Sequence, residues 1–101
     1  MRKATITGLG KYVPPKTLTN KDLEDIVDTS DAWIKSRTGI KKRHIAAEDV
    51  PTSELAYNAA VQALEKAELK ANELDMILVA TVTPDMAFPA TSCILEDKLE
   101  A

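Results

Sequence analysis

The chain has 101 residues, of which 45% are hydrophobic and 29% are charged, and its formal net charge at pH 7 is −3. This mild acidity argues against nucleic-acid binding, no run approaches the roughly 18 apolar residues of a membrane span, and the N-terminus lacks the apolar core of a signal peptide. The single Cys93 cannot form an internal disulfide, and no cluster of metal ligands is present. We therefore expect a soluble cytoplasmic protein without a metal site.

The first segment, Ala4–Thr7, is a short β-branched run that predicts a strand. Gly8 and Gly10 follow, but they do not make a dinucleotide-binding loop. Val13 stands where that motif has its third glycine, and Pro14-Pro15 blocks the helix that should come next. We expect the two glycines to serve a bend or a close packing contact.

A short surface helix is predicted next. Thr19 or Asn20 is its candidate N-cap, and acidic residues follow in the first turn. Leu23, Ile26 and Val27 fall at positions i, i+3 and i+4, which places them on one apolar stripe.

The following helix holds the only tryptophan, Trp33, four residues before Arg37, so both side chains lie on one face. Thr29 or Ser30 is its candidate N-cap, and Gly39 is a natural residue to end it. A flat ring beside a fixed cation suits a ligand with a planar ring and phosphates. The alternative is that Trp33 anchors the core and Arg37 is an ordinary solvated charge.

A small basic cluster, Lys41–Arg43, comes after this helix. It is either a solvated edge or a surface for an anionic ligand or an acidic carrier protein. His44 is the only histidine. The sequence fixes no carboxylate, serine or cysteine partner for it, so we expect a structural role.

The longest helix is predicted from a cap at Thr52 or Ser53 to about Leu69, and Lys70–Leu74 makes a connection with about one helical turn. Its apolar stripe is rich in alanine, which lets a helix lie close against a sheet. The stripe consists of Leu55, Ala56, Ala59, Ala60, Ala63, Leu64 and Ala67.

The near-continuous apolar run Met76–Val82 predicts a strand buried on both faces, as in a parallel sheet covered by helices. The loop after it carries the only phenylalanine, Phe88, which either inserts into a neighbouring cavity or fills the local core. A last helix is expected from Pro89 or Ala90 through Leu99. Its inward candidates are Ala90, Cys93, Ile94 and Leu95.

These elements indicate the α/β class. Two strands cannot make a stable sheet alone, so residues 1–101 read as the front part of a larger α/β domain. The residues resemble the N-terminal region of β-ketoacyl-acyl-carrier-protein synthase III. The resemblance rests on Gly8–Pro14, Thr19-Asn20, Leu23, Asp28–Ile34, Arg37–Ile40, Arg43, Leu78–Thr81 and Phe88–Ala90.

This resemblance implies a thiolase-like fold, with the chain as the N-terminal part of the first of two similar α/β halves. It also implies a homodimer that starts type II fatty-acid synthesis. In that reaction an acyl group passes from coenzyme A to a cysteine, and malonyl-acyl carrier protein is decarboxylated onto it. Acyl-CoA is then a substrate, no cofactor is expected, and the partners are acyl carrier protein, a second subunit and the remainder of the enzyme.

The resemblance also implies the site residues. Trp33 stacks on the CoA adenine, Arg37 and Thr29 contact the nucleotide portion, and Phe88 lines the acyl pocket of the opposite subunit. No catalytic residue is expected within residues 1–101, because the nucleophilic cysteine of the family follows shortly after Ala101. Cys93 is expected to be a small buried hydrophobic residue.

The 101-residue chain alone is accordingly expected to be inactive. Two alternatives stay open. One is another thiolase-like condensing enzyme, of the hydroxymethylglutaryl-CoA-synthase or alkylquinolone type. The other is a non-catalytic CoA-binding or dimerisation module.

Overall fold

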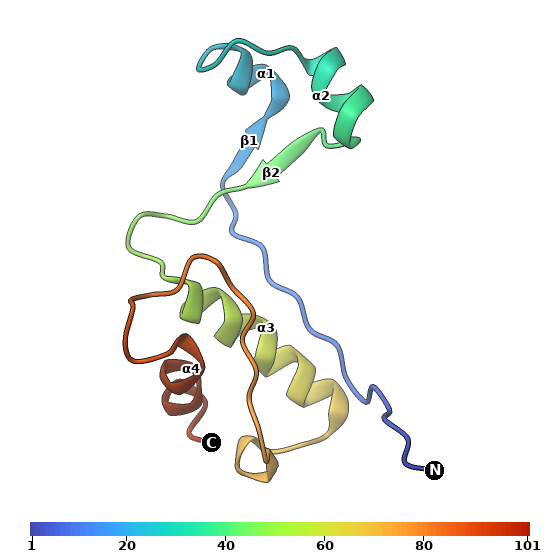
Figure 1. The fold of residues 1–101 in the computed structure, drawn as a ribbon, viewed down its shortest axis with the longest axis vertical. Helices are drawn as coiled ribbons and strands as arrows, with labels where there is room; N and C mark the ends of the chain where they lie inside the picture. Colours follow the sequence, from blue (N-terminus) through green and yellow to red (C-terminus); the bar gives the residue numbers. More distant parts are fainter. The chain divides into compact units, whose positions relative to one another are not determined.

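The computed structural model describes residues 1–101, and the chain forms two compact units (Figure 1). One unit is Val13–Glu48. The other combines Met1–Tyr12 with Asp49–Ala101. No helix is long and apolar enough to cross a membrane.

The unit Val13–Glu48 contains a two-stranded antiparallel sheet and two short helices. Strand β1 (Thr17–Thr19) pairs with β2 (Lys42–His44), with Leu18 opposite Arg43. Helices α1 (Asn20–Glu24) and α2 (Asp31–Thr38) lie between these strands in the sequence. Helix α1 ends before Ile26 and Val27, which are 67% and 53% exposed, so the predicted apolar stripe is wrong beyond Leu23.

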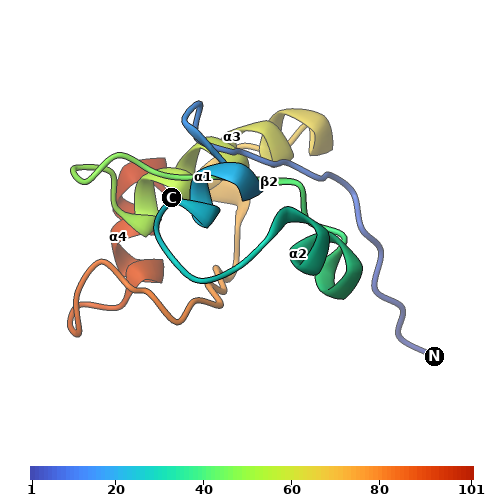
Figure 2. The same cartoon turned by 90° about the horizontal axis from the view of Figure 1, so that it is seen from above.

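The second unit is built on α3 (Thr52–Ala67), followed by the 3₁₀ turn η1 (Ala71–Glu73) and α4 (Thr91–Leu99). Helix α4 packs beside α3 (Figure 2), where Lys98 forms an ion pair of 2.9 Å with Glu54. Thr91 and Leu95 are the buried residues of α4. The long helix, the turn after it and the last helix are therefore confirmed, with α3 ending two residues earlier than expected.

Residues 8–11 run along α3, and residues 1–12 do not form the predicted strand (Figure 1). A Cβ at Gly8 would lie 2.9 Å from Cβ of Ala67, and one at Gly10 would lie 2.7 Å from the backbone nitrogen of Ala63. The alanine stripe of α3 therefore receives this segment, and the close packing role of both glycines is confirmed.

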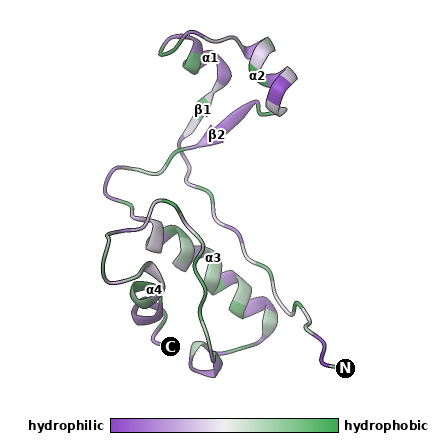
Figure 3. Cartoon of the chain, viewed as in Figure 1, coloured by the Kyte–Doolittle hydropathy of each residue, from purple (hydrophilic) through white to green (hydrophobic).

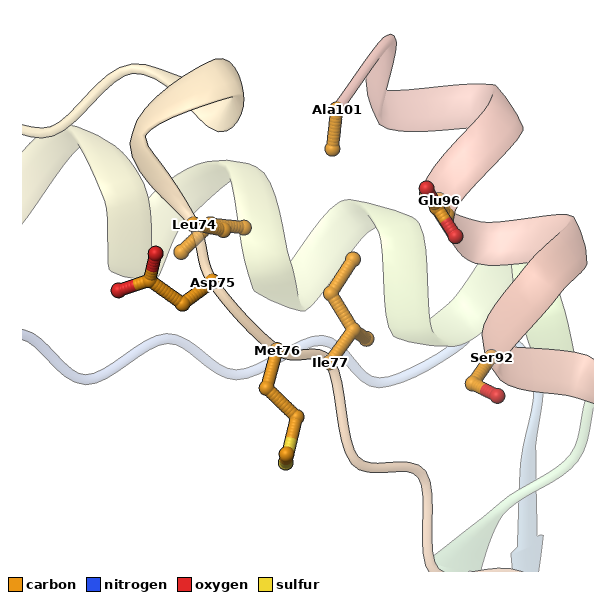
Figure 4. A pocket seen from close by; sticks show the side chains of 7 residues that line it. All are labelled: Leu74, Asp75, Met76, Ile77, Ser92, Glu96 and Ala101. Atoms are coloured by element: carbon orange, nitrogen blue, oxygen red, sulfur yellow. The ribbon is translucent and has the colours of Figure 1, made fainter.

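The apolar run after η1 is extended, but it pairs with no strand, so the predicted buried strand is also absent from this chain (Figure 3). Ile77 is half-buried, whereas Met76 and Leu78 are 73% and 87% exposed. Figure 4 shows Met76 and Ile77 pointing to opposite sides of the segment, with Ile77 beside a cavity of about 120 Å³ that Ser92 and Glu96 of α4 also line. One face is thus covered by helices and the other is bare. The physical reason is that residues 1–101 provide no neighbouring strand to complete the ladder.

Candidate functional site

Helix α2 presents the candidate site, and local interactions define both of its ends. The Ser30 hydroxyl accepts a hydrogen bond from the Trp33 backbone N–H at 3.1 Å, which makes Ser30 rather than Thr29 the N-cap. At the other end Gly39 has φ = 71°, a left-handed conformation that glycine adopts without steric cost. Lys35 also forms an ion pair of 2.7 Å with Asp31 along the helix.

Trp33 and Arg37 share one face of α2, as predicted. The Arg37 guanidinium carbon lies 5.7 Å from the centroid of the Trp33 ring, within the range of a cation–π contact. The Trp33 side chain is 56% exposed, and the only buried residue of α2 is Ile34. The alternative in which Trp33 anchors the core is therefore wrong for this chain.

An open pocket of about 310 Å³ lies beside Trp33. Asp28, Thr29 and Ser30 line it together with the indole, so Thr29 and Trp33 meet at one hollow and Arg37 flanks the ring. This volume falls at the low end of the range for small-molecule sites. The arrangement offers an aromatic surface, a hydroxyl and a cation to one ligand.

A polar network centred on the buried Asn20 supports the ends of α2. The Asn20 side chain donates to Asp31 at 2.9 Å and to the carbonyl of Ile40 at 2.7 Å, and it accepts from Arg43 at 2.9 Å. Hydrogen bonds from Lys35 and then from Asn20 hold the pKa of Asp31 below its ordinary value of 3.8. The sequence indicated Asn20 only as a capping candidate. Thr19 fills that role, in a reciprocal capping box with Asp22.

The network also changes the interpretation of the basic cluster. Arg43 is half-buried and engaged with Asn20 and with the carbonyl of Leu18, so only Lys41 and Lys42 form a solvated edge. His44 Nδ1 lies 2.6 Å from the carbonyl oxygen of Pro14, an arrangement that agrees with a structural role.

The remaining candidates lie in the other unit. Phe88 is 87% exposed, so it does not fill the local core. Cys93 is exposed, and the prediction that it is buried is wrong for this chain. Helix α4 buries Thr91 and Leu95, four residues apart on one face, and Cys93 lies midway between them, on the opposite side.

Known proteins were compared with the chain, and no family model matches it. It is 60% identical over 96 residues to β-ketoacyl-acyl-carrier-protein synthase III of Desulfitobacterium hafniense, which covers 95% of this chain and 29% of that relative. It is 58% identical over 98 residues to the protein of the same name from Xylella fastidiosa, covering 97% of this chain and 30% of the relative. The resemblance seen in the sequence is confirmed, and the chain spans about a third of the length of these curated relatives.

Solved structures give the same result. The chain matches 3-oxoacyl-acyl-carrier-protein synthase III of Aquifex aeolicus with a TM-score of 0.89 and 51% identity, over 95% of this chain and 31% of that one. The priming β-ketosynthase of the R1128 polyketide pathway matches with a TM-score of 0.89 at 32% identity, over 95% of this chain and 29% of the other. These matches confirm the predicted fold class, part of a thiolase-like α/β domain.

Proposed function

We propose that residues 1–101 are the N-terminal portion of a β-ketoacyl-acyl-carrier-protein synthase III, a condensing acyltransferase of fatty-acid synthesis. The observation that carries the proposal is the Trp33–Arg37 pair beside the pocket that Thr29 lines. The similarity over 95% of the chain supports it independently.

In this proposal α2 binds the nucleotide end of acyl-CoA. The adenine stacks on the exposed indole of Trp33, and phosphate oxygens accept hydrogen bonds from the Arg37 guanidinium, which is suited to binding them in a fork. Thr29 contributes a hydroxyl at the same pocket. In this proposal the cysteine that accepts the acyl group lies outside residues 1–101, because Cys93 sits within α4 and the only histidine, His44, belongs to the other unit.

Phe88 has a separate role in the proposal. Its exposed ring lines the acyl pocket of a second subunit in a cytoplasmic homodimer, and acyl carrier protein delivers the malonyl group. An exposed aromatic side chain in a loop is suited to such a contact, because it buries a large apolar area when a partner covers it.

The test is the substitution Trp33→Ala in the intact gene product that contains residues 1–101. We expect acyl-CoA binding to weaken by roughly 1–3 kcal/mol, the usual scale of aromatic stacking on a base, with the KM for malonyl-acyl carrier protein unchanged. Trp33→Phe is the matched control and should retain part of the affinity. An unaltered KM for acyl-CoA in Trp33→Ala would remove Trp33 from the site.

The intact mass of the gene product under denaturing conditions tests the role of residues 1–101 as a portion of the enzyme. A mass several-fold above 11.0 kDa supports the proposal. A native product of 11.0 kDa that binds CoA through Trp33 would instead favour a non-catalytic binding module.

A further inference from the structure

Asn20 is the only buried polar residue of the unit Val13–Glu48. It is 1% exposed, although asparagine usually lies at protein surfaces. Its Nδ2 donates to Oδ1 of Asp31 and to the carbonyl oxygen of Ile40, and its Oδ1 accepts from Nη2 of Arg43. Both of its N–H groups and its oxygen therefore have partners.

The two acceptors of Nδ2 lie at opposite ends of α2. Asp31 is the first residue of the helix, and Ile40 directly follows Gly39, which ends it. Glu24 at the end of α1 also accepts a hydrogen bond from the Asp31 backbone N–H at 2.8 Å. One amide group thus fixes both ends of the helix that carries Trp33 and Arg37.

We propose that Asn20 is a positioning residue for the nucleotide site: it holds α2 so that Trp33 and Arg37 face the ligand together. This inference rests on the proposed function. Helix α2 buries only Ile34, so apolar packing provides little orientation and the hydrogen bonds at its ends set its direction. A small misplacement of binding groups is enough to weaken a site.

The chemistry requires an amide at position 20. An aspartate has nearly the same shape, but it lacks both N–H donors and would place its carboxylate against the Asp31 carboxylate and the Ile40 carbonyl. Alanine would leave the Asp31 carboxylate and the half-buried Arg43 guanidinium without this partner.

The experiment is Asn20→Asp in the intact gene product, with kinetics measured for acyl-CoA. We expect KM to rise roughly tenfold with kcat nearly unchanged, because the site is misaligned and the chemistry is not. Asn72→Asp makes the same change at an exposed residue of η1 and should leave both constants unaltered. A merely structural role would lower the active fraction, and hence kcat, without changing KM, and that result would overturn the inference.

Asp31 provides a second route if Asn20→Asp does not fold. Asp31→Ala removes the acceptor of the hydrogen bond from Asn20 and should raise the KM for acyl-CoA. Asp31→Asn keeps an oxygen acceptor for Asn20, so its KM should stay near that of the unmodified protein. Equal KM values for these two variants would contradict a role through the Asn20 bond.

Combining Asn20→Asp with Trp33→Ala separates this inference from the proposed function. If Asn20 acts through Trp33, the fold increase in KM of the double variant should be well below the product of the fold increases of the two single variants. Independent, multiplying effects would overturn the inference. If Trp33→Ala alone leaves KM unchanged, the proposed function fails. If Trp33→Ala raises KM and Asn20→Asp does not, only the role of Asn20 fails.

Discussion

The carboxylate of Asp85 accepts two hydrogen bonds from Ser53, one from the backbone N–H at 2.8 Å and one from the hydroxyl at 2.5 Å. Ser53 is fully buried in the first turn of α3, and Pro51 at the N-cap has no side chain that can accept a hydrogen bond. The predicted cap at Thr52 or Ser53 is therefore wrong. A residue 32 positions away caps the helix instead, and its negative charge also suits the helix N-terminus.

Asp85→Ala should lower the free energy of unfolding by about 1–3 kcal/mol, because it removes the cap and leaves the buried Ser53 hydroxyl without its partner. Urea denaturation of the intact gene product measures this loss. Asp85→Asn keeps one acceptor oxygen and should cost less. Asp75→Ala, which removes an exposed carboxylate, is the control. Equal stabilities for the Asp85 and Asp75 alanine variants would contradict the capping role.

Gly10→Ala tests the contact between the N-terminal segment and α3. Its new Cβ would meet the backbone oxygen of Ala59 and the backbone nitrogen of Ala63, neither of which can rotate away. We expect a loss of roughly 1–3 kcal/mol, the usual cost of overpacking. Gly39→Ala has open space around its Cβ and should cost about 1 kcal/mol through its left-handed backbone alone. Thermal unfolding that ranks Gly39→Ala as the more damaging change would argue against the contact.

The sequence predicted those parts of the fold that depend on neighbouring residues. The caps and the shared face of α2 depend on residues within four positions of one another, and the alanine spacing of α3 marks the stripe that receives Gly8 and Gly10. The Trp33–Arg37 pair could be found for the same reason.

Parts that depend on distant partners could not be predicted in the same way. Met76–Val82 has the composition of a strand, but a strand exists only where another strand accepts its hydrogen bonds. The real strands, β1 and β2, are three residues each and too short to show a period. Asn20 and Asp85 carry no local pattern either, because their partners lie 11 and 32 residues away.

The pKa of Asp31, lowered by Lys35 and Asn20, predicts a pH dependence of stability. A carboxyl whose pKa falls on folding stabilises the protein above its unfolded pKa, and this contribution disappears as the pH falls through the folded pKa. Asp31→Asn should therefore be less stable than the unmodified protein at pH 7, and the difference should begin to shrink as the pH falls to the ordinary value of 3.8 and disappear only below the lowered pKa of the folded state. Urea denaturation at pH 7 and pH 3 checks this. Lys35→Met removes the main cause of the lowered pKa and should weaken the pH dependence, whereas a stability difference as large at pH 3 as at pH 7 would contradict it.

Phe88→Ala should broaden the range of acyl primers that the intact gene product accepts, because a smaller side chain enlarges the pocket that the ring is proposed to line. The measurement is kcat/KM for a series of straight and branched acyl-CoA substrates. Met86→Ala is a matched control, since Met86 is an exposed apolar residue of the same loop. An unaltered chain-length profile in Phe88→Ala would count against its pocket role.

Because one face of the segment Met76–Val82 is bare, we predict that lysine substitutions on this face have opposite effects in the 101-residue chain and in the intact gene product. Leu78 and Val82 are 87% and 97% exposed in residues 1–101, so the 101-residue chain expressed alone should self-associate through this extended edge. The double substitution Leu78→Lys and Val82→Lys should increase its monomer fraction, measured by light scattering, without lowering its helix content. Ile77→Lys, on the side facing the helices, should instead lower thermal stability.

In the intact gene product the same double lysine variant should be strongly destabilised, because a neighbouring layer of a complete thiolase-like domain would bury both charges. The informative result is that the same substitutions improve the behaviour of the 101-residue chain and destabilise the intact gene product. A variant that is equally harmless in both settings would mean that this face stays exposed to solvent, and the placement of residues 1–101 in a larger layered domain would have to be abandoned.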